Sequence, residues 1–494
     1  MLSTFFNPLT LTPGDASSRA TPLITEMRAQ IEALSANQTA IEEVFGLHKA
    51  GPSRLEIFHG YVGVFVVAFL TTLLLTPVMR RIALTYGVID RPTEARKIHK
   101  TPTPYLGGVA VYFGIIFAAI FTYTAPLHGL VDFHATEHVV KRIGLAGGLS
   151  IWILVGMTAI MACGLWDDIK GIHPRTKIAG MLFAAAALAT QDIGVRVAAG
   201  VILPAAKALG IGPNQMTGFT TRMVDGLETV LVIIPMPGGG GVSFDIVYWV
   251  GTAVIAIFVL GACNASNLID GLDGLSSGVT AIANVGLLAI ALTMASSDDG
   301  VLDGARIVLC LGVLGACLGF LPYNFNPANI FLGDAGSLLL GFCTIVIVLT
   351  LGDTGRTDLV LAGLIIYLIP IIDTSLAIVR RKLAGKSISD ADDQHLHHML
   401  KRALGVKGAV LALYGIAAGF AILGITLSEG RARVTYALTL VFVAFIGVTA
   451  FKIARRNQEL QARDPAFAPP AAPRSISGPS AHAQPTDPKG SKAA

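Results

Sequence analysis

The chain has 494 residues, of which 53% are hydrophobic and 14% charged, whereas a soluble domain carries about a quarter charged residues. Apolar stretches of about 18 residues or more recur along it, which is the length needed to cross a bilayer, so composition excludes a soluble globular protein. The formal net charge of +4 does not indicate a nucleic-acid partner, and we expect none.

These stretches predict an all-α polytopic membrane protein with about eleven transmembrane helices in the lipid bilayer, joined by catalytic cytoplasmic loops. The apolar segments lie near residues 58–80, 105–125, 143–164, 177–190, 245–263, 277–295, 304–322, 335–352, 357–377, 407–427 and 433–453. We therefore expect the transmembrane domain to occupy 56–456.

Three segments lie outside this pattern. Residues 1–55 are polar, with at most one short amphipathic helix expected, and they do not resemble a cleaved signal peptide. Residues 191–244 are mixed in character, and their stretch "PMPGGGGVSFDI" favours a small hairpin or a re-entrant turn over a helix. The Pro- and Ala-rich composition of 457–494 predicts a disordered tail.

Loop charge predicts the orientation, because lysine and arginine concentrate in cytoplasmic loops. The loops after the first, third and ninth segments are the richest in these residues, although Lys141, Arg142, Arg431 and Arg433 reduce the contrast. This distribution places the N-terminus and 191–244 outside and the tail in the cytoplasm. Every polar motif described below then falls on the cytoplasmic side, as expected if several loops assemble one site.

The stretch "GLWDDIKGI" (164–172) places Asp167 and Asp168 at the exit of the third segment. Adjacent carboxylates beside an apolar segment are unfavourable unless a cation or hydrogen-bond donors compensate them. The pair is interpreted either as a solvated helix end or cap, or as part of a binding site.

The stretch "NASNLIDGLDGL" (264–275) follows the fifth segment with Asn267, Asp270 and Asp273. Two Asp-Gly steps are typical of tight turns, and the spacing does not match a calcium-binding loop. The alternative is that glycine lets the backbone approach a ligand while the carboxylates meet a metal ion or sugar hydroxyls.

The stretch "NFNPANIFLGDAGSLLLGF" (324–342) opens the eighth segment with Gly333 and Asp334. Asp334 or Ser337 is able to cap the helix. The functional interpretation is stronger: a carboxylate at a helix N-terminus holds Mg²⁺ while nearby amides face phosphate oxygens.

Histidines and basic residues form two further motifs. "DADDQHLHHML" (390–400) carries His395, His397 and His398 beside three aspartates, which favours a ligand site, with zinc and a diphosphate as alternative ligands. "RPTEARKIHK" (91–100) is explained either by membrane-surface charge or by phosphate binding.

Together these motifs resemble the polyprenyl-phosphate N-acetylhexosamine-1-phosphate transferase superfamily, glycosyltransferase family 4. The resemblance covers about residues 58–405 and rests on "RKIHKTPTPYLGG", "DDIKG", "NASNLIDGLDGL", "NIFLGDAGSLLLG" and "DADDQHLHHML", in family order. The HLHH cluster is similar to the WecA/TagO branch, which uses UDP-GlcNAc. One departure is Asp392-Asp393-Gln394-His395 in place of the Asp-Arg-x-His often found in the family.

The resemblance implies transfer of a sugar 1-phosphate, GlcNAc-1-phosphate first, from a UDP-sugar to polyprenyl (undecaprenyl) phosphate with release of UMP. It also implies a bacterial inner membrane location, the first membrane step of a cell-envelope polysaccharide, and Mg²⁺ as cofactor, with Mn²⁺ as a substitute. Another UDP-HexNAc, UDP-MurNAc-pentapeptide and a multi-pass transporter are the alternatives, and a homodimer is left open.

The resemblance also assigns roles to residues. The expected catalytic residues are Asp167, Asp168 and Asp334, with Asp334 as the metal ligand. The expected substrate-binding residues are Asn267, Asp270, Asp273, His395, His397, His398, Lys97, His99 and Lys100.

Overall fold

The computed structural model describes residues 53–90, 102–125, 149–211, 218–224, 227–236, 241–297, 302–383, 395–430, 437–444 and 448. The expectations for the N-terminal extension and the C-terminal tail lie outside these residues, as do those for Lys97, His99 and Lys100.

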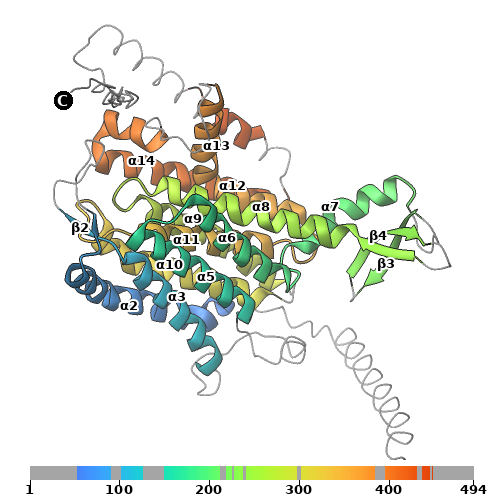
Figure 1. Ribbon diagram of the computed structural model, residues 1–494, viewed down its shortest axis with the longest axis horizontal. Coiled ribbons are helices and arrows are strands. Elements are labelled where there is room, and N and C mark those ends of the chain that lie inside the picture. The colour runs from blue at the N-terminus through green and yellow to red at the C-terminus, as the bar shows by residue number, and fades with distance from the viewer. Residues whose placement is uncertain are drawn as a thin grey trace, which may run out of the picture.

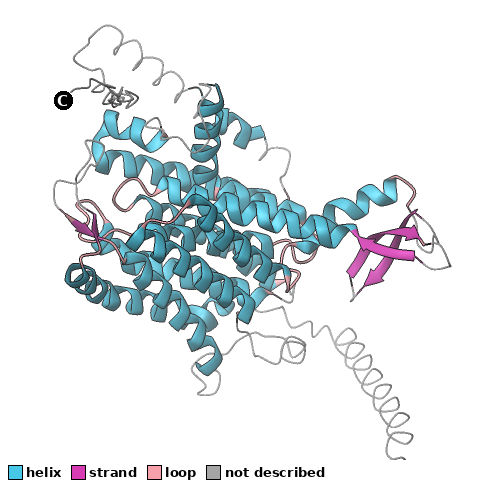
Figure 2. Cartoon of the chain, viewed as in Figure 1, coloured by secondary structure: helices cyan, strands magenta, loops and turns pink. Residues whose placement is uncertain are grey.

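Helices dominate the described part of the chain, as predicted (Figures 1 and 2). They are α2 (Arg54–Tyr86), α3 (Gly107–Thr124), α5 (Ile151–Lys170), α6 (Pro174–Ala189), α7 (Val195–Ala208), α8 (Ile246–Ile269), α9 (Leu275–Ser296), α10 (Asp303–Asn324), α11 (Gly333–Thr350), α12 (Thr357–Ile366), α13 (Leu368–Leu383) and α14 (Leu396–Ser428).

Eight of the described helices are long and apolar enough to cross a membrane, and α12 with α13 makes a ninth candidate. Helix α6, at the predicted fourth segment, has 16 residues and falls short of the length required for a span. The predicted eleventh segment lies largely outside the described residues. The chain is thus an all-helical polytopic membrane protein, whereas the count of eleven stays a prediction.

Helix α11 forms the centre of the bundle, with every residue except Asp334 buried, whereas only seven of the 33 residues of α2 at the periphery are buried. Small residues let its neighbours approach its backbone. A Cβ built on Gly164 of α5 would lie 2.6 Å from the Cα of Ala335, and one on Gly108 of α3 would lie 2.1 Å from the amide nitrogen of Gly336. Such contacts are typical of helix packing in membranes, and here they bring the end of α5 against the start of α11.

The ninth predicted segment, 357–377, is not one straight helix. Helices α12 and α13 meet at Tyr367 with a bend of 76°, and α13 runs steeply across the other helices in Figure 1. Pro370 explains the break, since proline lacks an N–H and its ring clashes with the carbonyl four residues earlier, here that of Ile366. The bend turns Asp373 of α13 toward the start of α14.

The segment 191–244 contains the predicted β structure, together with a helix, α7, that was not predicted. Strands β3 (Gly218–Val224), β4 (Leu227–Pro235) and β5 (Gly241–Asp245) form an antiparallel sheet in the order β3-β4-β5, which projects from the bundle beside α7 (Figure 2). A second antiparallel pair, β1 (Ile89–Asp90) with β2 (Thr103–Pro104), precedes α3.

Candidate active site

Four helix ends meet where the predicted motifs lie. Helix α5 brings Asp167 and Asp168 in its last turn, and only three residues separate the end of α5 from the start of α6. Helix α8 brings Asn267 in its last turn, and α11 begins at Gly333, directly before Asp334. Residues from three of the predicted motifs therefore lie in one cluster of side chains.

Lys177, in the first turn of α6, joins the two carboxylates of this cluster. Its Nζ lies 2.8 Å from Oδ2 of Asp167 and also forms an ion pair with Oδ2 of Asp334. The side chains of Lys177, Asp167 and Asp334 are 17%, 18% and 30% exposed, respectively. One ammonium group thus faces two carboxylates, which leaves one negative charge uncompensated, and all three groups remain accessible to a ligand.

Asp168 has a different environment from its neighbour. Its Oδ1 accepts a hydrogen bond from the backbone N–H of Asp334 at 2.8 Å, and its Oδ2 accepts one from Ala335 at 3.0 Å. Gly333 adopts a φ of +72°, and a Cβ there would lie 2.6 Å from Oδ2 of Asp168. Only glycine combines this left-handed backbone with room for the carboxylate.

This arrangement corrects two expectations about the start of α11. The expected cap, Asp334 or Ser337, is not found; the N-cap position is Leu332 without a side-chain hydrogen bond, and Asp168 from α5 caps the helix instead. The amides of Asp334 and Ala335 were expected to face phosphate oxygens, but they are engaged by Asp168. The physical reason is the packing of α5 against α11. It places the carboxylate of Asp168 at the N-terminus of α11, where the free amides would otherwise bind an anionic ligand.

Asn267 fixes the other side of Asp334. Its Nδ2 donates to Oδ1 of Asp334 at 2.7 Å and to Oγ of Ser337 at 3.0 Å. Each oxygen of the Asp334 carboxylate thus has its own partner, Asn267 for one and Lys177 for the other. The carboxylate is held in one orientation before any ligand arrives.

Asp270 and Asp273 have different environments, and of the two Asp273 is engaged in holding a loop in place. Asp273 accepts hydrogen bonds from Asn326 Nδ2 at 2.8 Å and from the N–H of Ala328 at 3.0 Å, so it anchors the loop before α11. Asp270 follows the last residue of α8. Burial raises its pKa well above the ordinary carboxyl value, and Asp334, Asp168 and Asp273 raise it further.

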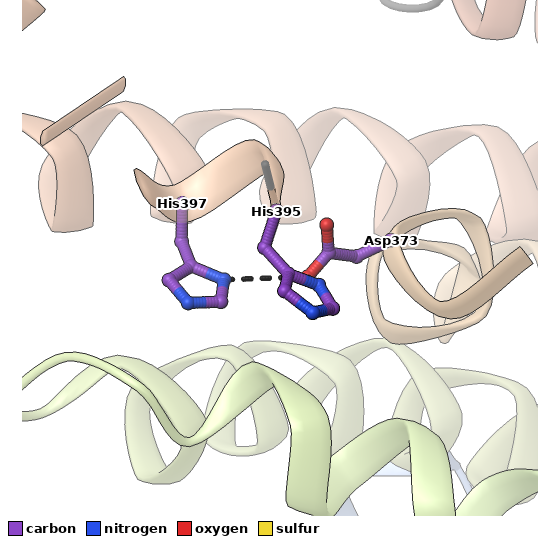
Figure 3. A group of neighbouring side chains, drawn as sticks. All are labelled: Asp373, His395 and His397. Carbon is purple, nitrogen blue, oxygen red and sulfur yellow. Dashed lines mark hydrogen bonds and ion pairs between the residues drawn. The ribbon is translucent and has the colours of Figure 1, made fainter. Parts of the chain in front are cut away.

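The histidine cluster is organised by a residue that sequence analysis did not identify, Asp373. Figure 3 shows its carboxylate meeting His395 and His397. Oδ2 of Asp373 lies 3.1 Å from Nδ1 of His395 and 3.3 Å from Nδ1 of His397, while Oδ1 accepts from the N–H of Leu396 at 2.7 Å. The side chains of Asp373, His395 and His397 are all buried. His398 lies beside them, with its ring centroid 4.3 Å from that of His397.

His397 connects this cluster to the turn after α8. A Cβ built on Gly271 would lie 2.5 Å from Nε2 of His397, so the imidazole occupies the space that a side chain at this position would need. The predicted motifs around Asp270 and His397 are therefore in contact, although about 125 residues separate them in the sequence.

Lys177 and Asp373 are the site residues that sequence analysis missed. Lys177 was counted only as loop charge, although Pro174 is typical of a first helical residue and places Lys177 in the first turn of a helix. Asp373 lies within a predicted membrane-spanning segment, and an ionisable residue there is by default a candidate functional residue. Both signals were present in the sequence.

Two sets of residues are able to hold a cation. Oδ2 of Asp167 and Oδ2 of Asp334 converge on one ammonium group, and two hard, partly exposed oxygen ligands fit Mg²⁺. Asp373, His395 and His397 offer three ligand atoms within 4.8 Å of one another, but two of these are imidazole nitrogens, which suit zinc better than Mg²⁺. The first set therefore fits the expected magnesium ion better.

Comparisons with known proteins identify relatives of this chain. Residues 150–352 match glycosyl transferase family 4. The chain is 30% identical over 388 residues to a Bacillus subtilis protein named probable undecaprenyl-phosphate N-acetylglucosaminyl 1-phosphate transferase, covering 78% of this chain and 90% of the relative. It is 31% identical over 411 residues to decaprenyl-phosphate N-acetylglucosaminephosphotransferase of Mycolicibacterium smegmatis, covering 80% and 89%.

A relative with a different named substrate is similar to the same extent. The chain is 30% identical over 378 residues to phospho-N-acetylmuramoyl-pentapeptide-transferase of Desulforudis audaxviator, covering 74% of this chain and 97% of the relative.

Proposed function

The chain belongs to glycosyl transferase family 4, the polyprenyl-phosphate N-acetylhexosamine-1-phosphate transferases, and we propose that it transfers GlcNAc 1-phosphate from UDP-GlcNAc to undecaprenyl phosphate. It is a glycosyl-1-phosphate transferase and a multi-pass membrane protein, which excludes the transporter alternative. The observation that carries the proposal is the convergence of Asp167 and Asp334 on Lys177 at one cluster of helix ends.

In the proposed reaction, an oxygen of the lipid phosphate attacks the phosphorus that carries the sugar. The bond from that phosphorus to the oxygen bridging it to UMP breaks, so the products are polyprenyl-diphosphate-sugar and UMP. Both substrates are anions, and phosphoryl transfer depends mainly on positioning them and compensating their charge. Lys177 is the described cation closest to Asp167 and Asp334, and it is accessible enough to exchange a carboxylate partner for a phosphate oxygen.

Mg²⁺ is the proposed cofactor, with Asp334 as its ligand and Asp167 as the second carboxylate within reach. When bound, the ion supplies positive charge to the phosphate oxygens of the donor. Asn267 keeps Asp334 in the orientation that this role needs, because it donates to the oxygen that does not face Lys177.

Asp168 supports the site through α11 and not through the substrates. Both of its oxygens accept backbone hydrogen bonds, so it is a poor candidate for a general base. A base is not required, since a phosphate monoester loses its second proton with a pKa of about 6 and is already a nucleophile at neutral pH.

The sequence around the histidines favours GlcNAc over MurNAc-pentapeptide as the proposed sugar. The cluster here continues as Met399 and Leu400, with Met399 buried, and lacks the Phe-Glu that ends the corresponding loop of the pentapeptide branch. His397 lies against Gly271, the residue after Asp270, so the hydroxyl and acetamido groups of any HexNAc donor bound here would find an imidazole and a carboxyl group.

The proposed location is the bacterial inner membrane, with the site facing the cytoplasm, where nucleotide sugars are made. The distribution of lysine and arginine among the loops supports this orientation. The lipid acceptor then keeps its chain in the bilayer while its phosphate reaches the helix ends, and the product starts a cell-envelope polysaccharide.

The test is a donor panel. Purified protein is incubated with undecaprenyl phosphate, Mg²⁺ and, separately, UDP-GlcNAc, UDP-GalNAc and UDP-MurNAc-pentapeptide, and UMP and the lipid product are measured. UDP-GlcNAc is expected to give the highest kcat/KM. A higher value for another donor would assign the chain to that sugar, and no product from any donor would reject the proposed function.

A further inference from the structure

Asp373 is the buried charge that the proposed reaction leaves unused. It lies on α13, is 2% exposed, and accepts hydrogen bonds from three residues at the start of α14. A buried carboxylate is unfavourable without compensation, and here three donors compensate it: the N–H of Leu396 and the Nδ1 atoms of His395 and His397.

These contacts determine how protons are placed on the two rings. An ionised carboxylate only accepts hydrogen bonds, so each Nδ1 that contacts it must carry a hydrogen. A neutral imidazole with Nδ1–H has an unprotonated Nε2. His397 therefore presents Nε2 at Gly271 as an acceptor when neutral and as a donor only when it becomes an imidazolium.

Whether Nε2 of His397 accepts or donates a hydrogen bond decides which ligand groups it can bind at the turn after α8. A phosphate oxygen is itself an acceptor, and it would be repelled by the lone pair of a neutral Nε2. An imidazolium whose Nδ1–H is held by a carboxylate donates from Nε2 instead, and the carboxylate stabilises that charge. A sugar hydroxyl, in contrast, can bond to either form.

We propose that Asp373 is a positioning residue for the histidine cluster: it holds His395 and His397 with Nδ1–H toward its own carboxylate and thereby directs Nε2 of His397 to the donor substrate beside Gly271. The role of His397 toward the donor rests on the proposed function, whereas the proton placement does not. Asp373 acts through the histidines and does not contact the substrate.

A zinc site made from the same three residues is the competing explanation. It would use one ligand atom from each residue, and the three residues offer such atoms within 4.8 Å of one another. However, a closed structural zinc site has four ligands, and only three ligand residues form this group in the described chain. Zinc bound in place of these hydrogen bonds, through Nδ1, would leave both Nδ1 atoms unprotonated, and zinc bound through Nε2 would be detected by elemental analysis.

The first test is spectroscopic and needs no activity. Protein labelled with ¹⁵N-histidine is reconstituted in bilayers, and the spectrum of His397→Ala is subtracted from that of the wild type to isolate His397 among the 11 histidines. Protonated Nδ1 is the expected result. Unprotonated Nδ1, or stoichiometric zinc by elemental analysis of the purified wild type, would overturn the proposal.

The second test asks whether Asp373 acts through His397. In Asp373→Asn, the amide oxygen is expected to keep the hydrogen bond from the backbone N–H of Leu396, because that donor cannot move. The NH₂ group then faces both imidazoles, so each histidine must shift its hydrogen to Nε2 and accept at Nδ1. We expect kcat/KM to fall at least about tenfold, by analogy with other partners that orient a histidine. In the His397→Ala background the same substitution should add less than about threefold, because coupled residues are not additive. A full additional loss in that background would contradict the proposal.

A matched control separates positioning from simple destabilisation. Asp353 is also buried, at the opposite end of α11, and pairs with Arg306 at 3.1 Å. Asp353→Asn should lower thermal stability while leaving the His397 spectrum unchanged; a changed spectrum would contradict a specific role for Asp373.

If Asp373→Asn does not fold, Asp373→Glu keeps the acceptor charge and should keep Nδ1 protonated. A wild type that is inactive with every donor would reject the proposed function, but the spectrum would still decide the role of Asp373.

Discussion

The side chain of Asp168 accepts a hydrogen bond from the backbone N–H of Asp334 at 2.8 Å, across 166 positions of sequence. One helix thus caps another, and the side chain of Asp334 is left to face Lys177 and Asn267. The adjacent residues Asp167 and Asp168 consequently have different environments: Asp167 belongs to the cluster of charges, and Asp168 to the scaffold that holds it.

Asp168→Asn should destabilise the protein as well as reduce its activity. The amide offers one oxygen where the carboxylate offered two, so its NH₂ group faces a backbone N–H. An unsatisfied buried group costs about 1–3 kcal/mol, and we expect the midpoint of thermal unfolding in detergent to fall by several degrees. Asp358→Asn, at an exposed side chain, is the control and should leave the midpoint unchanged. An unaltered midpoint for Asp168→Asn would show that the cap is not important.

Lys177→Met should abolish most activity. It removes the cation that Asp167 and Asp334 share, and with it the positive charge nearest to the expected phosphates. Loss of one such group costs about 10²–10³ in rate. Lys207→Met is the matched control, because its ammonium pairs with Glu228 on the sheet and is 60% exposed; its rate should equal that of the wild type. Initial rates of UMP release decide the result, and a loss below tenfold for Lys177→Met would remove it from the site.

Asp334→Asn tests the metal ion. The amide keeps the shape and the hydrogen bond from Asn267 but loses the charge, and the cap from Asp168 remains. We expect normal insertion and unfolding behaviour but a loss of at least about 10³ in kcat, or about 4 kcal/mol of transition-state stabilisation. EDTA should abolish wild-type activity, and Mg²⁺ or Mn²⁺ should restore it. If Asp334→Asn retains more than a tenth of the wild-type rate at saturating Mg²⁺, the ligand is to be sought at Asp167.

Asp270 predicts a pH dependence of stability. Its pKa in the folded protein is raised, so between about pH 4 and that value the folded state binds more protons than the unfolded state. The preferential protonation of Asp270 in the folded state therefore contributes fully to the free energy of unfolding below about pH 4. That contribution is lost as the pH rises through the folded-state pKa. In EDTA, Asp270→Asn should unfold at a higher temperature than the wild type at pH 8 and at a similar temperature near pH 4. Identical curves for both proteins at pH 8 would refute this.

Cysteine labelling tests the orientation. In a version without native cysteines, Ser297→Cys lies after α9, at the end remote from the site, and Ser389→Cys lies in the loop before the histidines. An impermeant thiol reagent should label Ser297→Cys in intact cells and Ser389→Cys only after permeabilisation. The reverse pattern would place the site outside the cytoplasm.

The sequence alone predicted the membrane class and the family, and it named most of the residues that the structure brings together at the candidate site. Apolar length is a local property, so candidate membrane-spanning segments could be located without knowing how they pack, and residues 191–244 were recognised as different in character. The number of eleven stays a prediction. The stretches around Asp167, Asn267 and Asp334 carry polar groups at the ends of apolar segments, where they are unfavourable unless they serve a site. That argument needs no tertiary structure.

Only the tertiary structure decided what each polar group does. Whether Asp168 or Asp167 faces the charged cluster depends on which side of α5 packs against α11, and the close approach at Gly164 settles it. The role of Asp373 depends on the bend at Tyr367, which brings α13 to the start of α14. Hydrogen bonds and ion pairs act over a few ångströms, whereas these partners lie tens to hundreds of residues apart, so their pairing is a property of the packed bundle and not of any single motif.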